Sequence, residues 1–267
     1  MPSVFKPMKV SVIMAVLNSH RIVKRQIRHF RNMRLPDDIE IIFVDDGSNP
    51  PIDMPNSGLN NLHILHTNDY RPWTQGLARN MGARFALGEY LFFTDVDHII
   101  SQEALMAVHA YTGDKMVFPR AFGIFDMQGN IIADADQLLR FGLSQGWYKR
   151  RGLGAGAHTN TFAMKKSLFV DLDGFEPKYC ESCFHVGGKY MSEERHFYLK
   201  FARHVRLGLA QPEVSGPMVY VYPIGRFHET GDENPCGLFH STSREQSPQP
   251  LLPSPSTERV NDAVPAP

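Results

Sequence analysis

The segment Tyr90-Leu-Phe-Phe-Thr-Asp-Val-Asp97 decides the fold, because a short apolar run ends there in two carboxylates one residue apart. The run from Tyr90 to Phe93 predicts a strand that lies inside a sheet. Carboxylates at the end of such a strand can reach one small volume if the backbone turns. They then suit an oxygen-preferring divalent ion shared with a substrate diphosphate. The alternative is a solvated loop, or a helix cap before Ser101.

Strands and helices alternate around this segment. Val10–Leu17 and Ile39–Val44 are continuous apolar runs, typical of strands buried on both faces. The other elements expected in this half are a helix from His20 to about Met33 with Ser19 as its N-cap, a strand at Leu62–His66 and a helix at Trp73–Leu87. Strands that alternate with helices predict a parallel sheet with right-handed crossovers, and so an α/β fold.

The pattern changes after Ser101, where strands become more frequent than helices. A helix is expected at Gln102–Tyr111, and strands at Lys115–Arg120, Ala121–Asp126 and Thr159–Met164. We therefore expect one domain over residues 1–240, whose first half binds a nucleotide and whose second half adds mixed-sheet elements. Residues 241–267 contain six prolines and no aromatic residue. This tail is expected to be disordered, with a docking peptide as the alternative.

The composition excludes several classes of protein. The chain has 267 residues, 42% of them hydrophobic, which rules out wholesale disorder and a fibrous repeat. Lys and Arg together number 28, as do Asp and Glu, so any polyanion binding must come from a local patch. Three cysteines do not form a disulfide framework. No apolar run approaches the roughly 20 residues of a membrane span, and residues 1–10 lack the apolar core of a signal peptide, so a cytoplasmic location is expected.

Polar residues follow the other predicted strands, at the edge where open α/β sheets bind their ligands. The first strand ends in Ala15-Val-Leu-Asn18 and the second in Val44-Asp45-Asp46-Gly-Ser48. Asp46 can accept a hydrogen bond from a ribose hydroxyl or a base N–H, or it can form a simple Asx turn. Arg79, in Gly76-Leu-Ala-Arg-Asn-Met-Gly82, can pair with a diphosphate or support the acids, or form a salt bridge on the helix surface.

Taken in this order, the motifs resemble those of the family 2 glycosyltransferases, which have the GT-A fold. Thr161–Phe175 is similar to the family's strand, helix and Gly-Phe element beside the acceptor, and Ser192-Glu193-Glu194 stands where the family has an acidic pair that opens a helix. The likeness spans about Val10 to Phe201. It implies a Rossmann-like nucleotide-binding sheet with a mixed acceptor-side half. It also implies an inverting transfer from a nucleotide diphospho-sugar, with a UDP-sugar expected, to a hydroxyl acceptor.

The resemblance also assigns roles to residues of this sequence. Ala15, Leu17, Asn18 and Asp46 would hold the nucleoside, Arg79 would lie near the base or diphosphate, and Asp95 and Val96 would contact the nucleotide sugar. Asp97, the second acid of the family's DXD motif, would bind Mn²⁺ or Mg²⁺, together with the late His228. The general base would be Glu194, or else Glu193, with Asp173 and His158 next in line. Ala15 and Leu17 stand where the family usually has Pro and Tyr, which removes an aromatic surface for the base.

Two further patterns lie outside these motifs. Cys180-x-x-Cys183 and Cys236-x-x-x-His240 have the spacings of a structural Zn²⁺ site, although buried free thiols are common. A basic stripe follows helical spacing at Arg21, Lys24, Arg25, Arg28 and Arg31. It is either a solvated helix face or a contact with a polyanion. The acceptor is therefore open among saccharides, lipid carriers and a modified nucleic acid.

Two rival functions predict different sequence features. A sugar-phosphate nucleotidyltransferase requires a glycine-rich loop after the first strand, and Asn18-Ser-His-Arg21 contains no glycine. A catalytically inactive nucleotide-sugar-binding scaffold would use the tail for docking. Asp97 and Glu194 are both present, which favours an enzyme. Metal-dependent hydrolysis of nucleotide sugars separates an enzyme from a binding protein.

Overall fold

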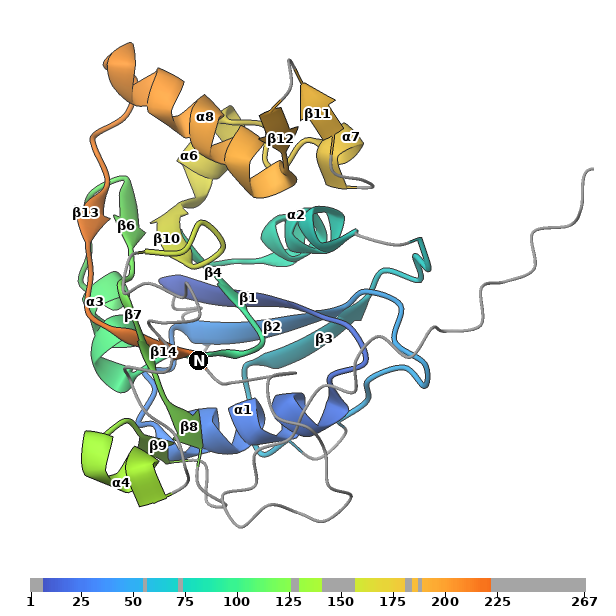
Figure 1. Cartoon of the computed structure of the whole chain (residues 1–267), viewed down its shortest axis with the longest axis vertical. Coiled ribbons are helices and arrows are strands. Elements are labelled where there is room, and N and C mark those ends of the chain that lie inside the picture. The colour runs from blue at the N-terminus through green and yellow to red at the C-terminus, as the bar shows by residue number, and fades with distance from the viewer. Residues whose placement is uncertain are drawn as a thin grey trace, which may run out of the picture.

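A seven-stranded mixed sheet forms the centre of the protein, in the order β13-β6-β10-β4-β1-β2-β3 (Figure 1). The computed structural model describes residues 7–54, 57–71, 74–125, 130–140, 157–180, 184–186 and 189–221. The strands of this sheet are β1 (Val10–Val16), β2 (Ile39–Asp45), β3 (Leu62–His66), β4 (Tyr90–Asp95), β6 (Lys115–Val117), β10 (Phe162–Lys165) and β13 (Val214–Ser215). The α/β fold expected from the sequence is confirmed.

Parallel pairing brings the ends of the polar motifs together. β1 lies between β2 and β4 and runs parallel to both. In this register Ala15 is paired with Val44 on one side and with Asp95 on the other. The motifs that follow β1, β2 and β4 therefore start at the same level of one sheet edge, where α/β sheets place their ligands.

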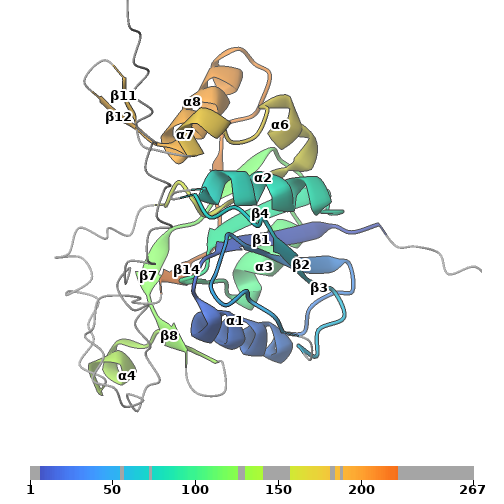
Figure 2. The ribbon, with the colours of Figure 1, turned by 90° about the vertical axis from the view of Figure 1, so that its right-hand side faces the viewer.

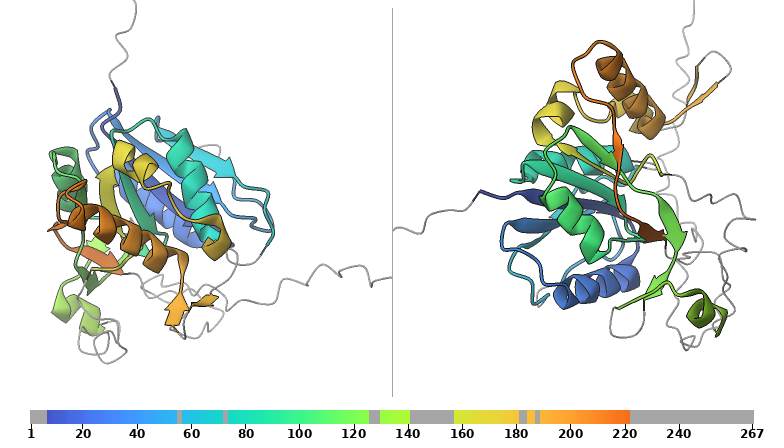
Figure 3. Two further views of the ribbon diagram at one scale, coloured as in Figure 1. Left: turned by 90° about the horizontal axis from the view of Figure 1, so that it is seen from above. Right: turned by 90° about the vertical axis from the view of Figure 1, so that its left-hand side faces the viewer.

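Helices cover both faces of the sheet. These are α1 (His20–Asn32), α2 (Gln75–Phe85), α3 (Gln102–His109), α4 (Ala135–Arg140), α6 (Lys166–Asp171), α7 (Pro177–Cys180) and α8 (Glu193–Arg206). Figure 2 shows α1 and α2 on opposite faces of the parallel strands, and the view from above shows α2, α6 and α8 over one face (Figure 3, left). Side chains alternate along each strand, so Val12 and Met14 pack toward α1 and α3, while Ile13 and Ala15 pack toward α2.

Helix α2 lies unusually close to the sheet because one of its residues is a glycine. A Cβ atom added to Gly82 would lie 2.6 Å from Ile13 Cγ2 and 3.1 Å from Val44 Cγ2. These distances are shorter than normal van der Waals contact, so any larger residue would push α2 away from β1 and β2. The glycine thereby fixes the height of α2 above the strands whose ends form the polar edge.

The second half of the chain adds the mixed part of the fold. β10 runs antiparallel to both β4 and β6, and β13 runs parallel to β6. A smaller sheet has the order β5-β14-β7, in which β14 is antiparallel to β5 and parallel to β7. The remaining strands are β5 (His98–Ile99), β7 (Arg120–Phe122), β8 (Ile124–Phe125), β9 (Ile131–Ile132), β11 (Phe184–Val186), β12 (Lys189–Met191) and β14 (Val219–Val221).

Two local expectations were wrong, and a third was confirmed in position only. The single strand expected at Lys115–Arg120 ends at Val117, because Pro119 cannot donate a ladder hydrogen bond and the chain passes into the smaller sheet at Arg120. Ser19 is the N-cap residue of α1, as expected, but its side chain makes no capping hydrogen bond, since its Oγ donates to the Leu17 carbonyl at 2.8 Å. Arg25 does not belong to the exposed basic stripe, because it is only 5% exposed, whereas Arg21, Lys24, Arg28 and Arg31 are exposed.

Other expectations are not tested by the described residues. The tail from residue 241 to 267 lies outside them, as do Cys183, Cys236 and His240 of the expected zinc pattern. Cys180 is described, and it is a buried free thiol. In the part of the chain that the structure describes, every helix is too short or too polar to cross a membrane.

Glu40 lies at the amino-terminal end of β2, at the other end of the strands from the polar motifs, and provides a test of the fold. Its carboxylate accepts hydrogen bonds of 2.6 Å from Ser11 Oγ and from the Leu87 backbone N–H. We predict that Glu40→Ala lowers the free energy of unfolding by about 1–3 kcal/mol, because a buried hydroxyl and a partly buried backbone N–H lose their acceptor. Glu40→Gln keeps an acceptor oxygen and should lose less, as measured by urea denaturation. An unchanged midpoint in Glu40→Ala would contradict this assignment.

Candidate active site

The loops after β1 and β2 are joined to each other. The Asn18 N–H donates to Ser48 Oγ at 2.8 Å, and the Asn49 N–H donates to Asn18 Oδ1 at 2.9 Å. Asn18 has a positive φ of 49°, a conformation that asparagine tolerates better than most residues. Leu17 is 53% exposed beside this junction, while Ala15 is buried within the strand. The two loops thus form one continuous surface at the sheet edge.

The neighbouring acids Asp45 and Asp46 have different partners. Asp45 accepts from the Ser48 and Ile52 backbone N–H groups at 3.0 and 2.8 Å, so its carboxylate holds the loop together. Asp46 accepts from the hydroxyl of Thr74 at 2.8 Å and from that of Thr67 at 3.3 Å. Burial raises the pKa of Asp46 above its ordinary value, although both hydroxyls oppose that shift. Asp45 is thus held by backbone groups of its own loop, whereas the described partners of Asp46 are side-chain hydroxyls.

Asp95 ends β4 and lies at the centre of the polar cluster. Its Oδ1 accepts from Arg79 Nη2 at 2.5 Å and from Gln75 Nε2 at 3.1 Å, both on α2. Its Oδ2 accepts from Asn160 Nδ2 at 3.2 Å, on the loop that leads into β10. Arg79 itself is 0% exposed. The sequence left open whether Arg79 meets a ligand or supports the acids, and in this structure it contacts Asp95.

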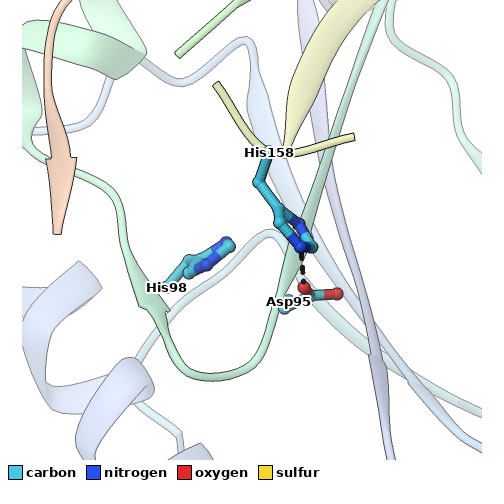
Figure 4. A group of neighbouring side chains, drawn as sticks. All are labelled: Asp95, His98 and His158. Atoms are coloured by element: carbon cyan, nitrogen blue, oxygen red, sulfur yellow. Dashed lines mark ion pairs between the residues drawn. The ribbon is translucent and has the colours of Figure 1, made fainter. Parts of the chain in front are cut away.

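Two histidines complete the surroundings of Asp95 (Figure 4). His158 Nδ1 lies 3.7 Å from Asp95 Oδ2, and the rings of His98 and His158 are 5.6 Å apart. Burial lowers the pKa of each imidazole to about 4, so both are neutral near neutral pH. Burial alone would raise the pKa of Asp95, but the charge of Arg79, helped by the hydrogen bond from Asn160, holds it below its ordinary value. The cluster therefore combines an ionised carboxylate with neutral imidazoles.

This donor set fits a divalent ion chemically. Each of Asp95, His98 and His158 offers one ligand atom, and these atoms all lie within 4.8 Å of one another. Neutral imidazole and carboxylate groups are acceptable ligands for Mn²⁺. Asp97 lies in the turn directly after β4, with its side chain half-buried, and Val96 precedes it in the same turn. His228 lies outside the described residues, so its expected place near the metal is not tested.

The motif Gly76–Gly82 holds the two halves of the site together. Asn80 Nδ2 donates to the Phe175 carbonyl at 2.7 Å, and the Phe175 N–H donates to Asn80 Oδ1 at 2.9 Å. A Cβ atom added to Gly76 would lie 2.5 Å from Cys180 Sγ and 3.1 Å from Glu193 Cγ. Through these contacts α2 sets the position of α7 and of the first turn of α8.

The two acids that open α8 differ in burial. Ser192 is the N-cap, and its Oγ accepts from the Arg195 N–H at 3.4 Å. Glu193 is 0% exposed and packs toward Gly76 and Cys180, whereas Glu194 is half-buried. The charge of Glu194 acts to raise the pKa of His158, which places Glu194 near the Asp95 cluster. Adjacent helical residues point about 100° apart, which explains why the two differ.

Sequence reasoning missed several residues that the structure brings to this edge. Asn160 and Gln75 contact Asp95, Thr74 contacts Asp46, and His98 adjoins Thr161. The only signal for His98 was its place directly after Asp97. Thr74 stands at the N-cap position of α2, but it makes no side-chain cap hydrogen bond there. No spacing rule pointed to Asn160.

The fold and this edge define a class of α/β protein that binds a ligand at the carboxyl ends of its parallel strands. Residues 11–172, more than half of the chain, match the family model described as "Glycosyl transferase family 2". The chain therefore belongs to glycosyl transferase family 2. The structural similarities below agree with the GT-A fold.

Individual related proteins share limited sequence identity with this chain or match only part of it. A poly(ribitol-phosphate) beta-glucosyltransferase of Bacillus spizizenii is 33% identical over 115 residues, which make up 40% of this chain and 18% of that protein. S. aureus TarS superposes with a TM-score of 0.51 at 19% identity, over 81% of this chain and 37% of TarS. A structure of TarS residues 1–349 in complex with UDP gives the same TM-score and identity, over 61% of that chain. The chain spans well under two thirds of the length of the first two proteins.

The Arg79–Asp95 pair yields a prediction about stability and pH. In Arg79→Met, Asp95 becomes a buried carboxylate without its guanidinium, which should lower the free energy of unfolding by about 3–5 kcal/mol near neutral pH. The pKa of Asp95 in the folded variant should then rise above its unfolded value, because burial is no longer opposed by Arg79. A raised carboxyl pKa penalises folding above that pKa, and the penalty fades as the pH falls through it.

Urea denaturation near pH 7.5 and near pH 5 measures the difference. The loss caused by Arg79→Met should be smaller at the lower pH. The double variant Arg79→Met/Asp95→Asn is the control, since it removes both charges and should be more stable than Arg79→Met at neutral pH. If the single variant loses the same stability at both pH values, Asp95 is not the group that carries the penalty.

Proposed function

We propose that this chain is a glycosyltransferase that moves a sugar from a nucleotide diphospho-sugar to a hydroxyl group of an acceptor. One observation carries the proposal: Asp46, Asp95 and Asp97 gather at the carboxyl edge of a sheet in a member of glycosyl transferase family 2. Glu194 lies near this cluster from α8. The proposed site thus combines acids on the nucleotide side with a further acid from a different element.

On the donor side, Ala15, Leu17, Asn18 and Asp46 would hold the nucleoside. The half-buried edge formed by the joined loops after β1 and β2 supports this assignment. Asp95 and Val96 would contact the nucleotide sugar, and Arg79 would act near it by fixing the Asp95 carboxylate. A UDP-sugar is the proposed donor, supported by the similarity to the fold of TarS, whose structure was determined in complex with UDP.

A divalent ion, Mn²⁺ or Mg²⁺, is the proposed cofactor. Asp97 would hold it, with His228 as a further ligand, and the carboxylate and neutral imidazoles around Asp95 make the surroundings suitable. When bound, such an ion supplies positive charge that stabilises the diphosphate leaving group. Burial of the cluster strengthens every charge interaction within it.

The proposed chemistry is a single displacement with inversion. The acceptor hydroxyl is a weak nucleophile, so Glu194 takes its proton as the oxygen attacks the anomeric carbon. The bond between that carbon and the diphosphate oxygen breaks, and the electron pair leaves with the nucleotide diphosphate. In-line attack places the base and the leaving group on opposite sides of the sugar, and Glu194 and Asp97 come from different elements, α8 and the turn after β4. Glu193, which is buried, would orient Glu194 or the acceptor.

The acceptor stays open among saccharides, lipid carriers and modified nucleic acids. The exposed Arg21, Lys24, Arg28 and Arg31 on α1 suit a polyanion, and the B. spizizenii relative is named for poly(ribitol-phosphate), a phosphate polymer. A screen of nucleotide sugars for thermal stabilisation with Mn²⁺, followed by an assay of donor hydrolysis, tests the proposal directly. Binding without any metal-dependent turnover would favour the inactive scaffold instead.

Asp97→Asn tests the proposed metal ligand. We expect this variant to lose metal-dependent donor turnover, because an amide is a poorer ligand for a hard divalent ion than a carboxylate. The fold should survive, since a half-buried side chain in a turn contributes little to the core. Turnover and the thermal midpoint are measured in parallel. A variant that turns over donor as fast as the parent would remove Asp97 from the site.

Glu194→Gln tests the proposed base, with Glu193→Gln as the matched control. Loss of a general base typically slows a reaction by about 10²–10⁴-fold, so transfer should fall by that factor at saturating donor. Donor and metal binding should persist, because the base acts on the acceptor hydroxyl. Glu193→Gln should lose less. A larger loss at Glu193 would exchange the two roles, and little loss at either would move the base to His158 or Asp173.

A further inference from the structure

Helix α1 holds the segment after β4 through its side chains. Gln26 Nε2 donates to the Val96 carbonyl at 2.9 Å and to the His98 carbonyl at 2.8 Å. His29 Nε2 donates to the Ile100 carbonyl at 2.8 Å. Both side chains are buried, and they follow one another along the same face of the helix. The carbonyls of every second residue in this short segment, Val96, His98 and Ile100, thus accept hydrogen bonds from side chains of α1.

These contacts from α1 take the place of a neighbouring strand along one side of the segment after β4. The segment contains β5, which within the described part of the chain is an edge strand of the smaller sheet and pairs with β14 alone. Backbone groups that point the same way along a strand recur every second residue, which is the spacing of Val96, His98 and Ile100. Gln26 and His29 therefore cover the second edge of β5, where another strand would otherwise pair. The edge is closed, and its geometry is fixed by a helix rather than by a ladder.

Gln26 is the more specific of the two residues, because its two carbonyl partners flank Asp97. The side-chain amide donates one N–H to the carbonyl of Val96, directly before Asp97, and the other to the carbonyl of His98, directly after it. Gln26 is 0% exposed, and its Oε1 has no hydrogen-bond partner within the described residues. A buried acceptor without a partner costs stability, and the two hydrogen bonds that Gln26 donates offset that cost.

We propose that Gln26 is a positioning residue, which holds the turn so that the Asp97 carboxylate faces the metal and diphosphate. The inference rests on the proposed function, since it assigns Gln26 a role toward the ion that Asp97 would bind. Groups that orient a metal ligand typically contribute 10–100-fold to metal affinity or activity. His29 donates to the carbonyl of Ile100, three residues beyond Asp97. It therefore stabilises the same segment, but we expect it not to orient Asp97.

The experiment compares Mn²⁺ binding in the presence of UDP, followed by electron paramagnetic resonance, across matched variants. Gln26→Met keeps the length of the side chain and removes both donors. Gln26→His keeps one ring donor, so it remains informative if Gln26→Met does not fold. His29→Met removes a hydrogen bond from the same helix to the same segment. Thermal unfolding of each variant reports the purely structural loss.

We expect Gln26→Met to weaken Mn²⁺ binding by about 10–100-fold, and Gln26→His to give an intermediate loss. His29→Met should lower the thermal midpoint yet leave Mn²⁺ binding at the level of the parent. Unchanged binding in Gln26→Met, or an equal loss in His29→Met, would overturn the inference and leave a structural contact only. Asp97→Asn tests the proposed metal ligand separately from the positioning role of Gln26. If this variant binds Mn²⁺ like the parent, the assignment of Asp97 as a metal ligand fails, and the role of Gln26 fails with it.

Discussion

The ion pair between Arg79 and Asp95 is the interaction on which the arrangement of this site depends. A guanidinium that is fully buried needs a carboxylate partner, because an unpaired charge in the interior is very costly. Asp95 can serve only where β4 ends, and Arg79 can reach it only if α2 lies close to the sheet. Gly82 permits that close approach over Ile13 and Val44. The pair therefore fixes the helix and the strand end with respect to each other.

The same helix passes this constraint to the second half of the chain. Asn80 binds both backbone groups of Phe175, and Gly76 leaves room for Cys180 and Glu193. Burial raises the pKa of the Cys180 thiol to about 12, and the charge of Glu193 adds to that shift, so the thiol is neutral and acts as an apolar contact. Every polar or glycine position of the motif thus has a partner on a different element. Because these partners all contact one short motif, residues from two distant parts of the sequence lie close together at the carboxyl ends of the parallel strands.

The sequence predicted most of the parallel half and the place of the acids, for a physical reason. Buried parallel strands are continuous apolar runs, and the polar residues that follow them must gather at one edge. Other features depend on contacts that no local pattern encodes. Arg25 fits a basic stripe by spacing, yet it is buried, and Pro119 divides a run that reads as one strand. Gln26 and Asn160 were not predicted, because their partners lie 70 and 65 residues away in the chain.

The first turn of α8 shows how one helix start can give two adjacent acids different roles. Negative charge is favoured at a helix N-terminus, so both Glu193 and Glu194 are stabilised there by the same dipole. Their directions differ by about 100°, and α2 and Cys180 occupy the direction of Glu193. Glu194 is left half-buried near His158 and the Asp95 cluster. Burial, rather than residue type, therefore distinguishes the two glutamates. The distinction is set by the same helix α2 that holds Asp95, so the Asp95 cluster and the first turn of α8 share a single support.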